Sequence, residues 1–151
     1  MLIRSFSEVY TKFKLHFYRS VFARLGDREA SLTTVETFCM EIIHALGKPT
    51  VNEFASFIAI SPPNAAYKVT NLISKGYLEK IQSLEDKREY YLIPTKKYFD
   101  YYNISQGYME TVADRVSKKV SEEEIKIFEK VLIVMSEELM PEMNPINKEM
   151  L

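Results

Sequence analysis

The sequence has little of several residue types, and each shortage excludes a class of protein. One cysteine among 151 residues cannot form an internal disulfide bond, so nothing points to an oxidising compartment. Four glycines, at positions 26, 47, 76 and 107, are too widely spaced to build a glycine-rich phosphate loop. No uncharged apolar run reaches the roughly 18 residues that a membrane span needs. The first residues, MLIRSFSEVYTKFK, lack the apolar core of a signal peptide, so we expect a cytoplasmic protein.

The overall composition is that of an ordinary globular domain. The hydrophobic fraction is 46% and the charged fraction 27%, and the length suits a single domain over residues 1–151. Twenty Lys and Arg face twenty-one Asp and Glu, which gives a net charge of −1. The total charge therefore gives no reason to expect a nucleic acid or a membrane as partner.

Apolar spacing and capping residues predict most of the helices. Apolar residues at three- or four-residue steps predict a first helix over residues 6–25. Three Thr-x-x-Glu or Ser-x-x-Glu pairs predict helix starts, because each side chain can satisfy a free backbone N–H at the start of a helix. These pairs are Thr33 with Glu36, Thr50 with Glu53, and Ser121 with Glu124.

The middle of the chain predicts a helix-turn-helix followed by a hairpin. Ser61 and Pro62 favour a helix start directly after the short helix that begins at Thr50. Strand-forming residues at 77–82 and 90–93 flank the polar segment SLEDKRE, which predicts a β-hairpin with a charged tip. Pro94 lacks an N–H, so the second strand is expected to end early. The predicted fold is mainly α with a small β-hairpin wing, a winged helix-turn-helix.

Two more helices are expected after the hairpin. Thr95 is a candidate cap for one long helix that continues to about residue 116. A clean apolar stripe predicts a last helix that ends before Pro141. The stripe consists of Ile125, Phe128, Leu132, Met135 and Leu139.

The near-zero net charge conceals a local asymmetry. Residues 61–97 hold seven Lys or Arg against four Asp or Glu, whereas residues 98–151 hold six against eleven. The basic excess coincides with the helix-turn-helix and the hairpin, as expected of a face that contacts DNA. Chance imbalance between arbitrary segments is the alternative.

The stretch from Leu32 to Lys97 resembles the MarR family of bacterial transcription regulators. The matching residues are LTTVETFCMEIIHALG, TVNEFASFIAISPPNAAYKVTNLISKGYLEK and SLEDKREYYLIPTKK, in which Asp86 and Arg88 fit the Asp-x-Arg wing motif of the family. The resemblance implies a winged helix-turn-helix DNA-binding core at 32–97 with flanking dimerisation helices at 1–25 and 98–140. It implies a homodimer that binds a double-stranded, pseudo-palindromic operator, as a repressor that responds to a small ligand.

The resemblance assigns DNA contacts to the second helix of the motif and to the wing. The recognition-helix set is Ser61, Pro62, Pro63, Asn64, Tyr67, Lys68 and Lys75, and the wing set is Asp86, Lys87 and Arg88. Arg88 would enter the minor groove with Asp86 orienting it, and Lys87 would touch phosphate. A solvated helix face and an ordinary charged turn are the alternatives. Because Pro62 and Pro63 stand where some relatives have hydrogen-bonding residues, no operator sequence can be transferred.

The flanking helices would supply the dimer interface and an effector pocket. The predicted interface residues are Phe6, Tyr10, Phe13, Phe128, Leu132 and Met135. Effectors in the family bind between the dimer helices and the winged domain, here lined by the first, second and fifth helices. The many aromatic residues would suit an apolar or aromatic ligand, although ordinary packing uses aromatic residues too.

Other chemistry receives little support from the sequence. Cys39 lies beside an apolar stripe, which favours an inert buried thiol over a redox sensor. His16 and His44 are isolated, and only Glu41 lies one helical turn from His44, so no metal or cofactor is expected. No nucleophile elbow or acid–base pair indicates an enzyme. A winged-helix protein-interaction module that does not bind DNA is the second hypothesis.

Overall fold

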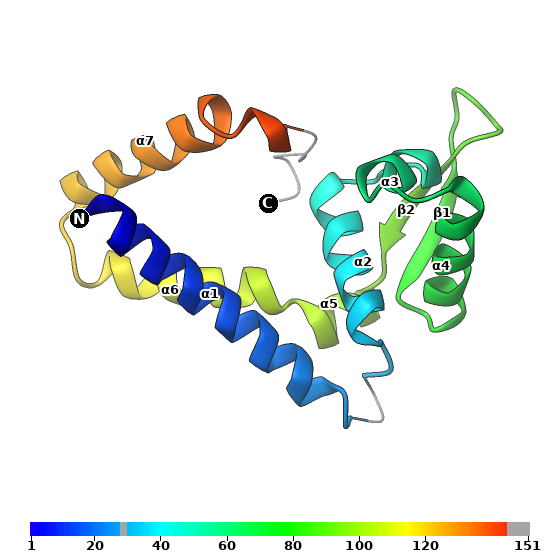
Figure 1. Ribbon diagram of the computed structural model, residues 1–151, viewed down its shortest axis with the longest axis horizontal. Coiled ribbons are helices and arrows are strands. Elements are labelled where there is room, and N and C mark those ends of the chain that lie inside the picture. Colours follow the sequence, from blue (N-terminus) through cyan, green and yellow to red (C-terminus); the bar gives the residue numbers. More distant parts are fainter. Residues whose placement is uncertain (28–29, 145–151) are drawn as a thin grey trace.

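The computed structural model describes residues 1–27 and 30–144, and it is mainly helical with one antiparallel hairpin (Figure 1). The predicted fold class is therefore confirmed. The elements are α1 (Leu2–Arg24), α2 (Thr34–Leu46), α3 (Val51–Phe57), α4 (Pro62–Ser74), β1 (Leu78–Gln82), β2 (Tyr90–Pro94), α5 (Lys96–Tyr102), α6 (Ile104–Ser117), α7 (Glu122–Glu138) and the 3-10 turn η1 (Pro141–Met143). Residues 30–102 gather into a winged-helix unit, and α1 and α6 form an arm that extends from it (Figure 1).

The predicted capping residues begin their helices as expected. The Thr33 hydroxyl accepts a hydrogen bond from the Glu36 N–H, and the Glu36 carboxylate accepts one from the Thr33 N–H at 2.8 Å. The same reciprocal pair begins α3 at Thr50 and α7 at Ser121. Ser61 caps α4 by accepting from the Asn64 N–H.

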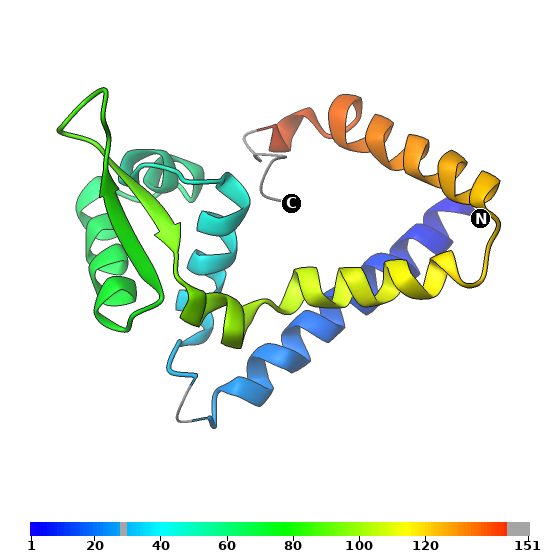
Figure 2. The same cartoon turned by 180° about the vertical axis from the view of Figure 1, so that it is seen from behind.

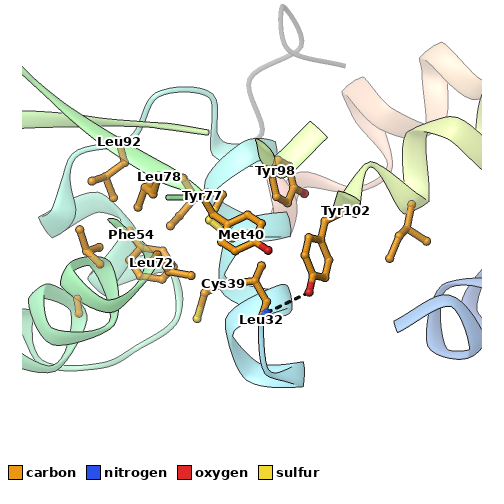
Figure 3. Close-up of a cluster of buried hydrophobic side chains, with 14 of the residues drawn as sticks. Leu32, Cys39, Met40, Phe54, Leu72, Tyr77, Leu78, Leu92, Tyr98 and Tyr102 are labelled. Carbon is orange, nitrogen blue, oxygen red and sulfur yellow. Dashed lines mark hydrogen bonds between the residues drawn. The ribbon is translucent and has the colours of Figure 1, made fainter. Parts of the chain in front are cut away.

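The core lies inside the winged-helix unit, where every helix from α2 to α5 and both strands contribute buried side chains (Figure 3). Tyrosine is prominent in it, because Tyr77, Tyr98 and Tyr102 are each almost fully buried. The Tyr77 and Tyr102 rings meet edge to face with centroids 5.4 Å apart, and the Tyr102 hydroxyl accepts a hydrogen bond from the Leu32 N–H. The α5 segment is thereby anchored to the start of α2.

The hairpin does not end early at Pro94, contrary to the expectation from the sequence. Its register pairs Leu78 with Pro94 and Gln82 with Tyr90, so the proline lies within the ladder. The Thr95 N–H reaches the Tyr77 carbonyl, whereas the Leu92 N–H points outward to Pro49. Because successive N–H groups alternate sides, residue 94 faces away from β1, and its missing donor removes no bond from the hairpin.

The helix expected after Thr95 is two helices, which corrects a second expectation. The chain breaks at Asn103, with φ −73° and ψ 58°, between α5 and α6. Thr95 does not cap α5 with its side chain, because its hydroxyl donates to the Gly76 carbonyl at 2.7 Å. Burial of Tyr98 and Tyr102 fixes α5 to the winged-helix unit, while α6 follows α1 along the arm.

The last long helix, α7, turns back from the end of α6 and stands apart from the winged-helix unit in both views (Figures 1 and 2). None of its residues is buried. Within the described residues, no helix has the length and apolar character needed to cross a membrane.

Candidate nucleic-acid interface

The α4 helix presents one face to the core and the opposite face to solvent. Ala65, Val69 and Leu72 are buried, which fixes the rotation of the helix. Ser61, Pro62, Pro63 and Asn64 are therefore exposed at its start, Tyr67 is 68% exposed, and Lys68 is half-buried. The rigid proline rings at the first two helical positions leave the exposed N-terminus well defined.

Sequence analysis did not single out Thr70, which the structure adds to this exposed face. Its side chain is exposed one turn beyond Tyr67, and its hydroxyl donates to the Ala66 carbonyl at 2.9 Å. Three-residue spacing from Tyr67 was the available signal.

The hairpin tip is ordered by its own polar side chains. The buried Ser83 hydroxyl accepts from the N–H groups of Glu85 and Asp86, each at 3.2 Å. The Asp86 carboxylate accepts from the Arg88 guanidinium at 3.0 Å and 2.9 Å and from the Arg88 N–H at 2.9 Å. These hydrogen bonds hold the pKa of the Asp86 carboxyl below its usual value. The Arg88 side chain remains 89% exposed, so the hairpin displays an oriented cation.

The start of α4 and the hairpin tip lie at the same end of the winged-helix unit (Figure 1). The reason is topological, because α4 turns at Gly76, with φ 85°, directly into β1, which runs back alongside it. The structure therefore brings together the predicted recognition-helix residues at 61–68 and the predicted wing residues at 86–88.

The cations of this unit differ in whether a carboxylate already neutralises them. Within residues 1–27 and 30–144, Lys68 and Lys87 have no ion-pair partner, and Arg88 is paired only with Asp86 at the exposed tip. Lys75 is different, because its ammonium contacts the Glu36 carboxylate at 2.7 Å and the Ser31 carbonyl at 3.1 Å. This pair joins the end of α4 to the start of α2.

A small pocket of about 290 Å³ opens between α1 and α6. Aromatic rings dominate its lining, and the His16 and Tyr108 rings stack at 3.7 Å with Phe13 against the edge of Tyr108. Lys14 and Ser105 supply polar groups. The lining comes from α1 and α6, whereas the sequence predicted a contribution from α2 as well.

The predicted dimer residues lie on the exposed apolar surfaces of α1 and α7. Phe6, Tyr10, Phe128 and Leu132 are exposed, and Phe13 and Met135 are half-buried. Neighbouring apolar residues extend the same surfaces. They include Leu2, Ile3 and Val9 on α1, and Ile127, Val131 and Ile133 on α7.

The cysteine and histidine side chains lie in packed surroundings. Cys39 is 5% exposed, and burial raises the pKa of its thiol, consistent with the expected buried thiol. His44 packs edge-on against Phe99 at 5.2 Å. No group of three or more His, Cys, Asp or Glu in the described part of the chain is arranged to hold a metal ion.

Comparison with known proteins gives a family match over the winged-helix unit. Residues 32–90 match the sequence model of the MarR family. No curated protein matches the sequence.

Several solved structures share the fold at low sequence identity. FabT of Streptococcus pneumoniae, solved in complex with DNA, has a TM-score of 0.59 and 21% identity, over 92% of this chain and 97% of FabT. A MepR mutant from a multidrug-resistant clinical isolate of S. aureus has a TM-score of 0.63 and 14% identity, over 93% and 98%. A transcriptional regulator of Thermotoga maritima has a TM-score of 0.62 and 18% identity, over 89% and 94%.

Proposed function

We propose, on the premise that residues 32–90 form a MarR-family winged helix-turn-helix domain, that this chain is a transcriptional regulator that binds DNA in the cytoplasm. The observation that carries the proposal is the placement of the α4 N-terminus and an oriented, exposed Arg88 at one end of the winged-helix unit, within the basic stretch 61–97. FabT, which shares the fold, was solved in complex with DNA. Proteins of the family are regulators rather than enzymes.

On the DNA, α4 occupies the major groove and the hairpin tip reaches the adjacent minor groove. Asn64 and Tyr67 face base edges or phosphates, Lys68 and Lys87 face phosphates, and Arg88 enters the minor groove. Asp86 is a positioning residue for Arg88, since it fixes the guanidinium with two hydrogen bonds.

The regulator acts as a homodimer of the whole chain, with the winged-helix core at 32–97 and the dimer helices at 1–25 and 98–140. The support is the pair of exposed apolar surfaces on α1 and α7, because a monomer would leave them in water. Two α4 helices in a dimer would read a pseudo-palindromic operator with half-sites about one helical turn apart, ~10 bp. Binding to a promoter in this way would repress transcription.

An apolar or aromatic small molecule regulates the dimer by occupying the pocket between α1 and α6. Its ring-lined wall favours such a ligand, and Lys14 and Ser105 provide polar contacts. Regulation requires that the ligand bind the DNA-competent and incompetent arrangements unequally.

DNA binding is tested by selecting duplexes from a random library and measuring affinity by fluorescence anisotropy at fixed salt. Arg88→Ala is expected to weaken binding about tenfold per protomer while the dimer stays intact. Lys118→Ala is the matched control, because it removes one exposed, Asp-paired cation from the arm. Equal affinity of Arg88→Ala and the parent would refute the wing role. A parent that selects no duplex at low salt would favour the protein-interaction module instead.

A further inference from the structure

Two connections join the winged-helix unit to the arm: the segment between α1 and α2, and the joint between α5 and α6, which is the single non-helical residue Asn103. Asn103 ends α5 and begins α6 without a side-chain cap at the start of α6, whereas the Arg24 guanidinium of α1 donates to the Tyr101 carbonyl in the last turn of α5. On one side α5 is anchored by the buried Tyr98 and Tyr102, and on the other α6 runs beside α1 (Figure 2). The angle at this point is therefore set by side-chain contacts, which on the α1 side are the buried Val21, the stacked Phe17 and Phe38 rings and the hydrogen bond from Arg24.

One carboxylate spans this joint from α2. Glu41 accepts a hydrogen bond from the Tyr98 hydroxyl at 3.0 Å, before the break, and from the Ser105 hydroxyl at 2.9 Å, after it. Hydrogen bonds to a charged acceptor are stronger than hydrogen bonds between neutral groups. The two donors to Glu41 belong to two different helices, Tyr98 to α5 and Ser105 to α6. Glu41 thus fastens α5 and α6 to the same point on α2.

Glu41 is partly buried, which strengthens the hydrogen bonds that it accepts at the joint. Burial raises the pKa of the Glu41 carboxyl, with the hydrogen bonds from Ser105 and Tyr98 and the nearby His44 acting against that change. The carboxylate depends on its two hydroxyl donors because it has lost much of its hydration. The His44 ring lies against Tyr98 and Phe99 on the α5 side of this cluster.

We propose that Glu41 is a positioning residue that, together with the contacts of α1, fixes the angle between the winged-helix unit and α6, and thereby the spacing of the two α4 helices on DNA. The inference rests on the proposed function, since spacing matters only in a DNA-bound dimer. Half-sites follow the helical repeat of DNA, so a shift by about one base pair, ~3.4 Å along the axis, changes which operator fits.

The test removes the hydroxyl donors without altering α2. The Tyr98→Phe/Ser105→Ala variant deletes both hydrogen bonds, Glu41→Ala deletes the acceptor, and Glu41→Gln keeps a side chain able to bond to both. Ser117→Ala is the matched control, because its hydroxyl donates to Asp114 within α6 at 2.8 Å. Each is measured for affinity to duplexes whose half-sites are set one base pair closer or farther apart. Amide hydrogen exchange at residues 103–107 is measured without DNA.

The double variant and Glu41→Ala should exchange faster at 103–107. Their preference for the parent's best spacing should fall at least about tenfold, because each variant loses two charge-assisted hydrogen bonds in each protomer. Glu41→Gln should restore most of that preference, and Ser117→Ala should behave as the parent. The double variant changes only the exposed Ser105 and the hydroxyl of Tyr98, so it should still fold. The proposal is overturned if this variant keeps the parent's spacing preference and exchange rates. A parent that binds no duplex refutes the proposed function, and the exchange rates then decide whether Glu41 holds the joint.

Discussion

The ion pair between Lys75 and Glu36 gives a test of which cations in the winged-helix unit contact DNA. Lys75 belongs to the predicted recognition-helix set, but its ammonium is held by Glu36 at 2.7 Å and by the Ser31 carbonyl at 3.1 Å. The charge-balanced variant Glu36→Gln/Lys75→Met removes the pair and leaves the net charge unchanged. Glutamine still suits the third position of the capping box that begins α2.

The expected change in the salt dependence of DNA binding follows from how many phosphates each side chain can neutralise. Each phosphate neutralised contributes about −0.9 to the slope of log affinity against log salt, so one lysine per protomer contributes about −1.8 in a dimer. Lys87→Met is expected to reduce the slope by about that amount, since no carboxylate in the described residues neutralises Lys87. The Glu36→Gln/Lys75→Met variant is expected to keep the parent's slope.

The Glu36→Gln/Lys75→Met variant is expected to lower the free energy of unfolding instead. The pair is partly buried, with the Lys75 and Glu36 side chains 32% and 17% exposed, so its loss should cost about 1 kcal/mol, or roughly 2–4 °C in Tm. Burial acts to raise the pKa of the Glu36 carboxyl, but the hydrogen bonds from Lys75 and Thr33 outweigh it and lower that pKa. The stabilisation is therefore present above the ordinary carboxyl pKa, and it is lost as pH falls through the lowered value in the folded protein.

The assay combines anisotropy titrations over a salt series with urea unfolding at neutral and acidic pH. The stability difference between the parent and Glu36→Gln/Lys75→Met should shrink in acid. If this variant loses as much salt slope as Lys87→Met does, Lys75 leaves Glu36 to contact phosphate, and the reasoning from the ion pair is wrong.

Two further predictions concern the arm and the core. Leu132→Glu places a charge on the apolar surface of α7 and should shift the dimer to monomer in sedimentation velocity. Lys130→Glu, on the same helix, is the control and should leave the dimer intact. If the dimer is unaffected by Leu132→Glu, α7 is not part of the interface. Cys39 should react with a thiol reagent far more slowly in the native protein than in concentrated urea, because burial raises the pKa of its thiol, and equal rates would contradict its placement in the core.

Local signals in the sequence predicted the helix starts well. The capping pairs and Ser61-Pro62 act within four residues, so neighbours in the chain determine the outcome. Thr95 stands at the N-cap position of α5 as predicted, but its hydroxyl does not cap the helix because it bonds instead to the Gly76 carbonyl, nineteen residues earlier in the chain. The break at Asn103 also depends on tertiary contacts. Burial of Tyr98 and Tyr102 holds α5 in the core of the winged-helix unit, so the chain changes direction after α5 before α6 begins.

The candidate interface was predictable in composition but not in detail. Helical spacing placed Asn64 and Tyr67 on one surface, and the structure shows both exposed there. The capture of Lys75 by Glu36, thirty-nine residues away, could not be read from spacing. Glu41 carried no sequence signal beyond its position before His44, because its donors come from two helices that the sequence merged into one.

The packed tyrosines give the protein an intrinsic optical signal. The chain has no tryptophan, so tyrosine dominates its near-ultraviolet absorption and circular dichroism. Tyr77, Tyr98 and Tyr102 are immobilised with neighbouring ring centroids 5.4 Å and 6.5 Å apart, close enough for their electronic transitions to couple. Their dichroism reports tight packing where α5 meets α2, and it would vanish in a molten globule that kept its helices. Loosening of this region can therefore be followed spectroscopically without an attached dye.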